Sequence, residues 1–278
     1  MPIIETKRDD IGALQGVHLF HFAMSNCSQR VRFVLEEKGI SWVSHHIDLA
    51  KCENATPDFR AINPKGLVPI LIHDGKTIVE SNDIIRYIDE NFEGPGLSPV
   101  GRSDKDFLVD SLNRSSDFQA SLKLLTHTFL FKPFRRMNAR QLKKYSEGVQ
   151  NPELADFMRE FSSKEGFSRE RIVAAIDAAE DNFKFLETRL ETHRWLTGPE
   201  FGLADISWLV NVHRLSQFYY PLASYPLLTD WLSRTRTRQA YKKAISQFQP
   251  TKLTVVFNIY SMIRRMRRSS VRDYVAAR

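Results

Sequence analysis

The chain has 278 residues, of which 42% are hydrophobic and 26% charged, and its formal net charge is +7. This length gives a core that needs neither a metal nor a disulfide to fold. From Thr251 to Arg278, seven basic residues face one acidic residue, so +6 of the net charge lies in this tail. The rest of the chain is nearly neutral, which argues against a nucleic-acid-binding protein, because such a protein carries positive charge on the fold itself.

The cysteines and adjacent histidines indicate neither a disulfide framework nor a metal site. The two cysteines are Cys27 and Cys52, and residues 1–13 contain no apolar segment typical of a secretion signal. We therefore expect free thiols and a cytoplasmic protein. No metal site is expected, since His45 and His46 are adjacent on a predicted strand and would point to opposite faces.

The first third of the sequence predicts a small α/β layer in the order β-α-β, connector, β-β-α. Strands are indicated by alternation and β-branched runs, and helices by apolar spacing after a polar start. The predicted elements are strands at 17–22, 42–47, 68–73 and 77–79, a helix over 29–38, and a helix from 81 to 88 capped by Ser81.

The remainder of the sequence predicts helices. Residues 93–99 (EGPGLSP) are rich in glycine and proline and indicate a boundary. Apolar residues between 172 and 190 recur at helical spacing, which predicts a long amphipathic helix. The expected organisation is an α/β domain at 14–92, a linker at 93–103, a helical domain at 104–249 and a basic tail at 250–278.

Four local motifs in this order resemble the glutathione transferase superfamily, over roughly Val17 to Gln247. They are Ser25 to Arg32 (SNCSQRVR), Asn63 to Pro69 (NPKGLVP), Glu80-Ser81, and Leu203 to Ile206 (LADI). The resemblance implies a thioredoxin-like N-terminal domain that binds glutathione, followed by an all-α C-terminal domain for an acceptor substrate. It also implies glutathione as co-substrate, no metal, and a homodimer.

Glutathione reacts as a thiolate, and the residue that stabilises this thiolate is the first catalytic candidate. A free thiol has a pKa near 8.5, so only about 3% is ionised at pH 7. A helix N-terminus lowers such a pKa, and a hydroxyl there donates one further hydrogen bond to sulfur. The resemblance places Ser25 in this role, with Asn26 assisting. Ser25 also suits a helix N-cap, and both roles can hold at once.

Cys27 is the competing candidate. At the activating position, a cysteine would form mixed disulfides and give a thiol reductase. The register to Arg30 and Arg32 instead places Ser25 there, so we expect Cys27 to be buried and inert.

The resemblance also implies the residues that bind glutathione. Val68-Pro69 matches the family's cis-proline turn, which would let the Val68 backbone pair with the cysteinyl backbone. Glu80 and Ser81 match the pair that recognises the ammonium and carboxylate of the γ-glutamyl end. Lys65 is placed to meet the glycyl carboxylate, although a solvated lysine is the alternative.

One motif departs from the family pattern. The family usually has Ser or Thr before Leu-Ala-Asp, forming a capping box with the aspartate. Here that residue is Gly202, so only Asp205 of the box remains. A glycine N-cap costs little, so we expect the helix to form and Asp205 to be structural.

The acceptor is expected to be a small aromatic electrophile or an aryl ether, bound between Ser25 and the helical domain. Candidates for the wall lie in residues 124–131 and 218–220. Further motifs resemble bacterial glutathione-dependent β-etherases, which cleave β-aryl ethers of lignin-derived dimers. The stretches that carry this resemblance are 62–66 (INPKG), 73–76 (HDGK), 166–168 (GFS) and 193–196 (HRWL).

Two alternatives stay open. A general detoxifying transferase would share every glutathione-site residue. A non-catalytic, membrane-associated relative, like the ganglioside-induced differentiation-associated proteins, is indicated by the tail. There the eleven residues 253–263 are mostly apolar and are followed by RRMRR; they are shorter than the roughly 20 that span a bilayer. An interfacial helix is one reading, and a tail folded over the active site or the dimer partner is the favoured one.

Overall fold

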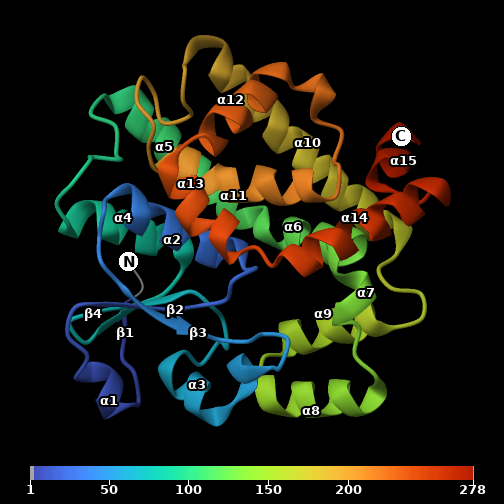
Figure 1. Ribbon diagram of the computed structural model, residues 1–278, viewed down its shortest axis with the longest axis horizontal. Coiled ribbons are helices and arrows are strands. Elements are labelled where there is room, and N and C mark those ends of the chain that lie inside the picture. Colours follow the sequence, from blue (N-terminus) through green and yellow to red (C-terminus); the bar gives the residue numbers. More distant parts are fainter. Residues whose placement is uncertain (1–2, 278) are drawn as a thin grey trace. The chain divides into compact units, whose positions relative to one another are not determined.

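The computed structural model describes residues 3–277 (Figure 1). The chain forms two compact units. The first takes the chain up to Gly94 together with Arg136–Lys164, and the second takes Pro95–Arg135 and the chain from Glu165 onward. No helix within the described residues is long and apolar enough to cross a membrane.

The first unit contains a mixed five-stranded sheet. Its strand order is β1 (Ile3–Ile4), β5 (Lys76–Ile78), β4 (Ile70–His73), β2 (Val17–His21) and β3 (Val43–His46). β2 and β3 are parallel, and the other neighbours are antiparallel. The last four strands confirm the predicted ones, within two residues at each end. β1 was not predicted, because it is only two residues long and pairs with a strand more than 70 residues away.

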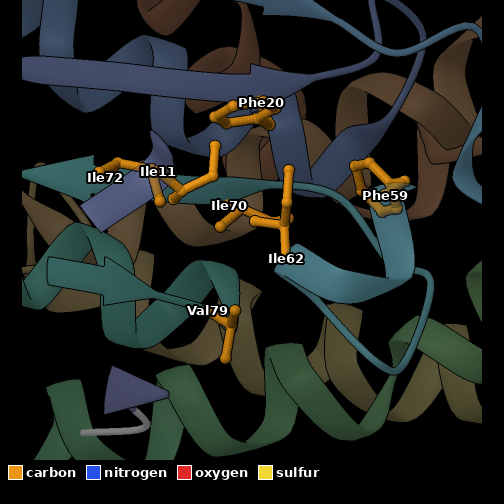
Figure 2. Packing of buried hydrophobic residues seen from close by; sticks show 7 residues of the cluster. All are labelled: Ile11, Phe20, Phe59, Ile62, Ile70, Ile72 and Val79. Atoms are coloured by element: carbon orange, nitrogen blue, oxygen red, sulfur yellow. The ribbon is translucent and has the colours of Figure 1, made fainter. Parts of the chain in front are cut away.

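At the central strand β4, both faces of this sheet are buried. Ile70, Leu71 and Ile72 of β4 are all fully buried although successive side chains on a strand point to opposite faces. On one face Ile70 and Ile72 join a cluster with residues of α1 (Asp9–Gly12) and α3 (Pro57–Ile62); Figure 2 shows its members, Ile11, Phe20, Phe59, Ile62, Ile70, Ile72 and Val79. α2 (Asn26–Glu37) and α4 (Ser81–Asn91) pack against each other in the same unit.

A helix pair from later in the sequence completes the first unit. α8 (Ala139–Val149) and α9 (Pro152–Ser162) pack together, and α8 contacts the short 3-10 helix Glu53–Ala55. A Cβ atom on Gly148 would lie 3.0 Å from the Ala55 carbonyl oxygen, so glycine permits this close approach. Asn151 donates a hydrogen bond to the Lys65 carbonyl (3.3 Å), which connects the pair to the loop before β4.

The second unit is helical, with α11 (Leu203–Gln217) at its centre. Every α11 residue from Leu203 to Leu215 is buried, and Trp208 donates to the Ser111 carbonyl at 3.1 Å. The predicted amphipathic helix is confirmed within α10, which begins after an N-cap at Ser168. The helices are α5 (Arg102–Asp117), α6 (Gln119–Thr126), the π-helical turn η2 (His127–Phe131), α7 (Lys132–Arg135), α10 (Arg169–Thr192), α11, α12 (Pro226–Arg236), α13 (Gln239–Ala244), α14 (Thr251–Met266) and α15 (Val271–Ala276).

Candidate functional site

The strand register brings the predicted glutathione-site residues to one edge of the sheet. Phe20, near the end of β2, pairs with Ile70 at the start of β4, and Leu71 pairs with Ile78 at the end of β5. The chain therefore leaves β2, enters β4 and leaves β5 at the same edge. The segments attached there carry all seven candidates: Ser25, Asn26, Lys65, Val68, Pro69, Glu80 and Ser81.

Ser25 is the N-cap of α2. Its backbone is extended (φ −76°, ψ 124°), and its hydroxyl oxygen accepts a hydrogen bond from the Ser28 amide at 3.3 Å. α2 accordingly begins at Asn26, three residues earlier than predicted. A hydroxyl that accepts from an amide keeps its own proton as a donor. The capping role is therefore confirmed, and it leaves the O–H able to donate to a thiolate.

The loop before β4 is fixed by Asn63, a side chain to which the sequence motifs assigned no role. The Val68-Pro69 bond is cis, as predicted. Asn63 is buried; its amide donates to the Leu67 carbonyl at 3.0 Å and its oxygen accepts from the Lys65 amide at 3.1 Å. Both bonds span only two to four residues. The Asn-Pro-Lys-Gly sequence, typical of a turn, was the signal that could have identified them.

Glu80 and Lys65 form an ion pair across the two loops. The Lys65 Nζ lies 2.8 Å from the Glu80 Oε1, and both side chains are about half exposed or more. Glu80 has a φ of 64°, in the left-handed region that residues other than glycine rarely adopt. Glu80 also occupies the N-cap position of α4, and Ser81 is the first helical residue. The prediction that Ser81 caps this helix was therefore wrong by one position, because the turn after β5 ends one residue earlier.

The Ser81 hydroxyl accepts a hydrogen bond from a buried arginine. Arg30, on α2, is 1% exposed, and its Nη1 donates to the Ser81 Oγ at 2.6 Å. Burial lowers the pKa of Arg30. An arginine guanidinium remains cationic in proteins, so Arg30 places positive charge beside the N-terminus of α4. A helix N-terminus with such a charge favours a bound carboxylate. In the sequence, Arg30 served only to align the motif that contains Ser25, and its role beside Ser81 was not predicted.

A second buried arginine fixes the turn that carries Ser25. Arg32 donates to the carbonyls of Phe22 (3.3 Å) and Ala23 (3.0 Å), and its Nη1 lies 3.1 Å from the His21 Nδ1. Burial lowers the pKa of Arg32 to about 9 and that of His21 to about 3. At neutral pH a cationic Arg32 therefore donates to a neutral His21, and the β2–α2 turn is held by both.

The expectation for Cys27 needs correction. Cys27 forms no disulfide, lies on the first turn of α2 and is half-buried rather than buried. The buried residues of α2 begin one position later, at Ser28, so Cys27 lies just before the buried part of the helix. Cys52 likewise forms no disulfide and is half-buried.

In the second unit, Asp205 is buried and accepts four hydrogen bonds. They come from the amides of Leu196 (2.8 Å), Thr197 (3.1 Å) and Gly202 (3.0 Å) and from the Trp231 indole (2.7 Å). The carboxylate thus joins the start of α11, the preceding loop and α12, which is a structural role.

The glycine that departs from the family pattern is explained by crowding. A Cβ atom on Gly202 would lie 2.1 Å from the Leu97 carbonyl oxygen, which accepts from the Leu203 amide at 2.9 Å. The capping hydroxyl comes instead from Thr197, whose Oγ1 accepts from the Ala204 amide at 3.1 Å. A residue from the preceding loop therefore performs what the Ser or Thr before Leu-Ala-Asp does in the family.

Two of the aromatic residues considered for the acceptor wall pack on each other, whereas Tyr219 is 40% exposed. Phe129 and Phe218 are 2% and 3% exposed, with ring centroids 5.7 Å apart. Leu125 and Leu130 are fully buried. These residues form part of the core of the second unit, and packing accounts for them. In the part of the chain that the structure describes, no three His, Cys, Asp or Glu side chains are grouped to hold a metal.

Comparison with known families agrees with this geometry. Residues 19–96 match the family described as "Glutathione S-transferase, N-terminal domain", and residues 140–234 match "Glutathione S-transferase, C-terminal domain". Glutathione S-transferase 1 of Dianthus caryophyllus is 30% identical over 77% of this chain and 84% of its own length. Ganglioside-induced differentiation-associated protein 1-like 1 of Homo sapiens is 25% identical over 89% of this chain and 78% of its own.

A solved structure shares the fold. The β-etherase LigF from Sphingobium sp. strain SYK-6 superposes with a TM-score of 0.76, at 24% sequence identity, over 84% of this chain and 100% of that one. The predicted fold class, a thioredoxin-like domain followed by an all-α domain, is confirmed.

Proposed function

This chain belongs to the glutathione S-transferase family, and we propose that it uses the glutathione thiolate to cleave β-aryl ether bonds in lignin-derived aromatic dimers. The observation that carries the thiolate chemistry is the position of Ser25, whose hydroxyl caps α2 at the sheet edge where the glutathione-site segments meet. A short run of backbone donors and one hydroxyl at a helix N-terminus is suited to stabilising a thiolate.

In the proposed reaction, the sulfur attacks the carbon that bears the aryloxy group. A neighbouring ketone activates that carbon for displacement. The carbon–sulfur bond forms as the carbon–oxygen bond breaks, so the electron pair leaves with the aryloxide, which takes up a proton and departs as a phenol. The other product is a glutathione thioether. Ser25 donates to the sulfur and Asn26, the first residue of α2, assists.

Glutathione would be held by charges at each of its ends. Ser81, backed by Arg30, receives the γ-glutamyl carboxylate, and Glu80 receives its ammonium. Lys65 receives the glycyl carboxylate, and the Val68 backbone pairs with the cysteinyl unit. The ion pair between Lys65 and Glu80 is exposed and hence worth only about 0–1 kcal/mol. Glutathione binding can therefore replace this ion pair by one ion pair from Lys65 and one from Glu80 to the ligand, at a small cost in free energy.

Ether cleavage as the specific reaction is supported by the likeness in fold to LigF and by the four sequence stretches that resemble the β-etherases. A general conjugating transferase is the second candidate, supported by the 30% identity to the Dianthus glutathione S-transferase. The two share the glutathione site and differ in the acceptor.

The test is phenol release from a racemic β-aryl ether ketone dimer in the presence of glutathione. We expect cleavage that requires glutathione and falls by about 10²-fold or more in Ser25→Ala, the size of effect seen when one preorganised donor is removed. Cys27→Ala, two residues along the same turn, is the matched control and should retain activity.

Three other outcomes are informative. Conjugation of a chloronitrobenzene without ether cleavage would replace the β-etherase proposal by the general transferase. Loss of activity in Cys27→Ala but not in Ser25→Ala would exchange the two roles. Glutathione binding without turnover of either substrate would contradict a catalytic function and favour the non-catalytic relatives.

A further inference from the structure

The outer face of α14 carries an apolar stripe. Among the side chains that the structure describes, five of the twelve exposed large apolar ones lie on this one helix, between 38% and 70% exposed: Val255, Val256, Ile259, Met262 and Met266. Four of them recur at the spacing i, i+4, i+7, i+11, so they share one face. Single exposed apolar residues are ordinary, but a contiguous exposed stripe marks an interaction surface.

The opposite face fixes this helix to the second unit. Phe257 is 2% exposed, and the Tyr260 hydroxyl donates to the Thr128 carbonyl at 3.3 Å. Arg264 donates to the same carbonyl at 3.3 Å, and its guanidinium lies over the Phe129 ring, 4.7 Å from the centroid. α14, drawn in orange-red in Figure 1, is therefore a docked helix with a defined orientation, and the stripe faces outward because the other face is anchored.

Positive charge surrounds the stripe. Exposed basic residues stand before the stripe (Lys252), within its last turn (Arg265) and past its end (Arg267, Arg268 and Arg272). The single acid after Thr251 is Asp273, and its carboxylate accepts from the Ser270 amide (2.8 Å) and hydroxyl (2.6 Å). An exposed apolar face bordered by one lysine and several arginines, with no acid between residues 251 and 272, is the pattern of a helix that lies in a membrane interface.

We propose that α14 docks the protein on a membrane surface rich in anionic phospholipid. The apolar stripe enters the boundary between headgroups and acyl chains, and the basic residues bind the phosphates. The helix lies on the surface and does not span it, because 16 residues extend about 24 Å and the hydrocarbon core is about 30 Å thick.

Charge also argues against a second copy of the chain as the occupant. Two-fold pairing of this face would set the stripe of one protomer on the same stripe of the other. In the antiparallel arrangement, Lys252 of one helix approaches Arg265 of the other, and no acid between 251 and 272 can offset the repulsion. An anionic lipid surface supplies the charge that a second copy lacks.

The test is co-sedimentation of the full chain with vesicles. One preparation is phosphatidylcholine alone, and the other contains about 30 mol% phosphatidylglycerol. We expect binding to the anionic vesicles at least about tenfold tighter than to the neutral ones, and weakened by about 0.5 M salt. Ile259→Glu and Met262→Glu should each reduce this binding by about tenfold or more, since each places a charge in the apolar stripe.

The matched control is Val109→Glu. Val109, on α5, is 53% exposed, against 50% for Ile259, so the same substitution changes an exposed helical valine away from the stripe. It should bind vesicles like the unaltered chain. A triple change of Arg265, Arg267 and Arg268 to Gln should reduce binding to anionic vesicles alone. Because all these sites are exposed, circular dichroism should show the helical fold retained.

Two results would overturn the proposal. One is equal or absent binding to both vesicle types by the folded chain. The other is a concentration-dependent dimer that Ile259→Glu dissociates, without vesicle binding, which would assign the stripe to a second copy. Neither result depends on the ether-cleaving activity.

Discussion

Arg30 of α2 and Ser81 of α4 are joined by a hydrogen bond of 2.6 Å between the guanidinium Nη1 and the serine Oγ. α2 begins directly after Ser25, and α4 begins at Ser81. One buried contact therefore connects the helix proposed to stabilise the glutathione sulfur with the helix proposed to hold the γ-glutamyl carboxylate.

Ser81→Ala should weaken both the fold and glutathione binding. The change removes an acceptor from a buried cation, and a hydrogen bond to a charged group contributes about 1.5–3 kcal/mol. Urea unfolding should show a loss of this size, and titration should show a Kd for glutathione raised about tenfold, or 1.4 kcal/mol. Ser81→Thr keeps the hydroxyl and should recover much of the affinity. Equal affinity in Ser81→Ala and the unaltered chain would contradict the assigned role.

Lys65→Met should raise the KM for glutathione by about threefold to tenfold and leave kcat nearly unchanged. Lys65 is proposed to bind the glycyl carboxylate, which is remote from the sulfur, so its contact is equally strong in ground and transition states. Steady-state kinetics with varied glutathione measure both constants. Lys76→Met, an exposed lysine on β5, should change neither. A parallel fall in kcat would mean that Lys65 acts on the reacting end.

Gly202→Ser restores the residue type that the family carries before Leu-Ala-Asp, yet it should destabilise the protein. The new Cβ would lie 2.1 Å from the Leu97 carbonyl oxygen, and such overpacking costs about 1–3 kcal/mol. Gly101→Ser is the matched control. Gly101 is the N-cap of α5, and a Cβ there would meet only Asp104 Oδ2, at an ordinary 3.6 Å. The control should be neutral or stabilising by a few tenths of a kcal/mol.

Thr197→Val should lower the free energy of unfolding by about 1 kcal/mol, because Thr197 supplies the hydroxyl that caps α11. The substitution keeps the shape of the side chain and removes the acceptor for the Ala204 amide. Thermal or urea unfolding measures the loss. An unchanged stability would show that Asp205 alone is enough to cap the helix.

Acidification should destabilise the second unit through His127 and His213. Burial lowers the pKa of each to about 3, whereas an unfolded histidine has a pKa near 6.5. Below about pH 6.5 the unfolded state therefore binds protons that the folded state does not. The stability is complete above that pH and is lost as the pH falls toward 3, at up to about 1.4 kcal/mol per pH unit for each histidine.

Urea unfolding at several pH values between about 7.5 and 5 tests this dependence. His213→Gln should reduce the slope, since one buried titrating group is removed while a polar side chain remains near the Tyr241 hydroxyl, 3.1 Å from the His213 Nδ1. An identical slope in His213→Gln and the unaltered chain would exclude His213 as a source.

The features that could be predicted from the sequence are those that local chemistry controls. Residue pattern predicted the strands β2 to β5 and the long helix α10, and Ser25 was recognised as a helix N-cap. These features depend on side-chain periodicity and on hydrogen bonds across three or four residues, so a short segment of sequence is enough to specify them. The cis Val68-Pro69 bond and the family were also predicted, from short motifs that each consist of consecutive residues.

The contacts between residues far apart in the chain could not be predicted from the sequence and became visible only in the tertiary structure. Arg30 reaches Ser81 across 51 positions, β1 pairs with β5, and α8 packs on the loops of the sheet unit. Crowding by the Leu97 carbonyl explains why a glycine stands at 202, and the anchored face of α14 decides which of its side chains remain exposed. Such pairings depend on which surfaces meet once the chain is compact, and no local pattern in the sequence specifies that.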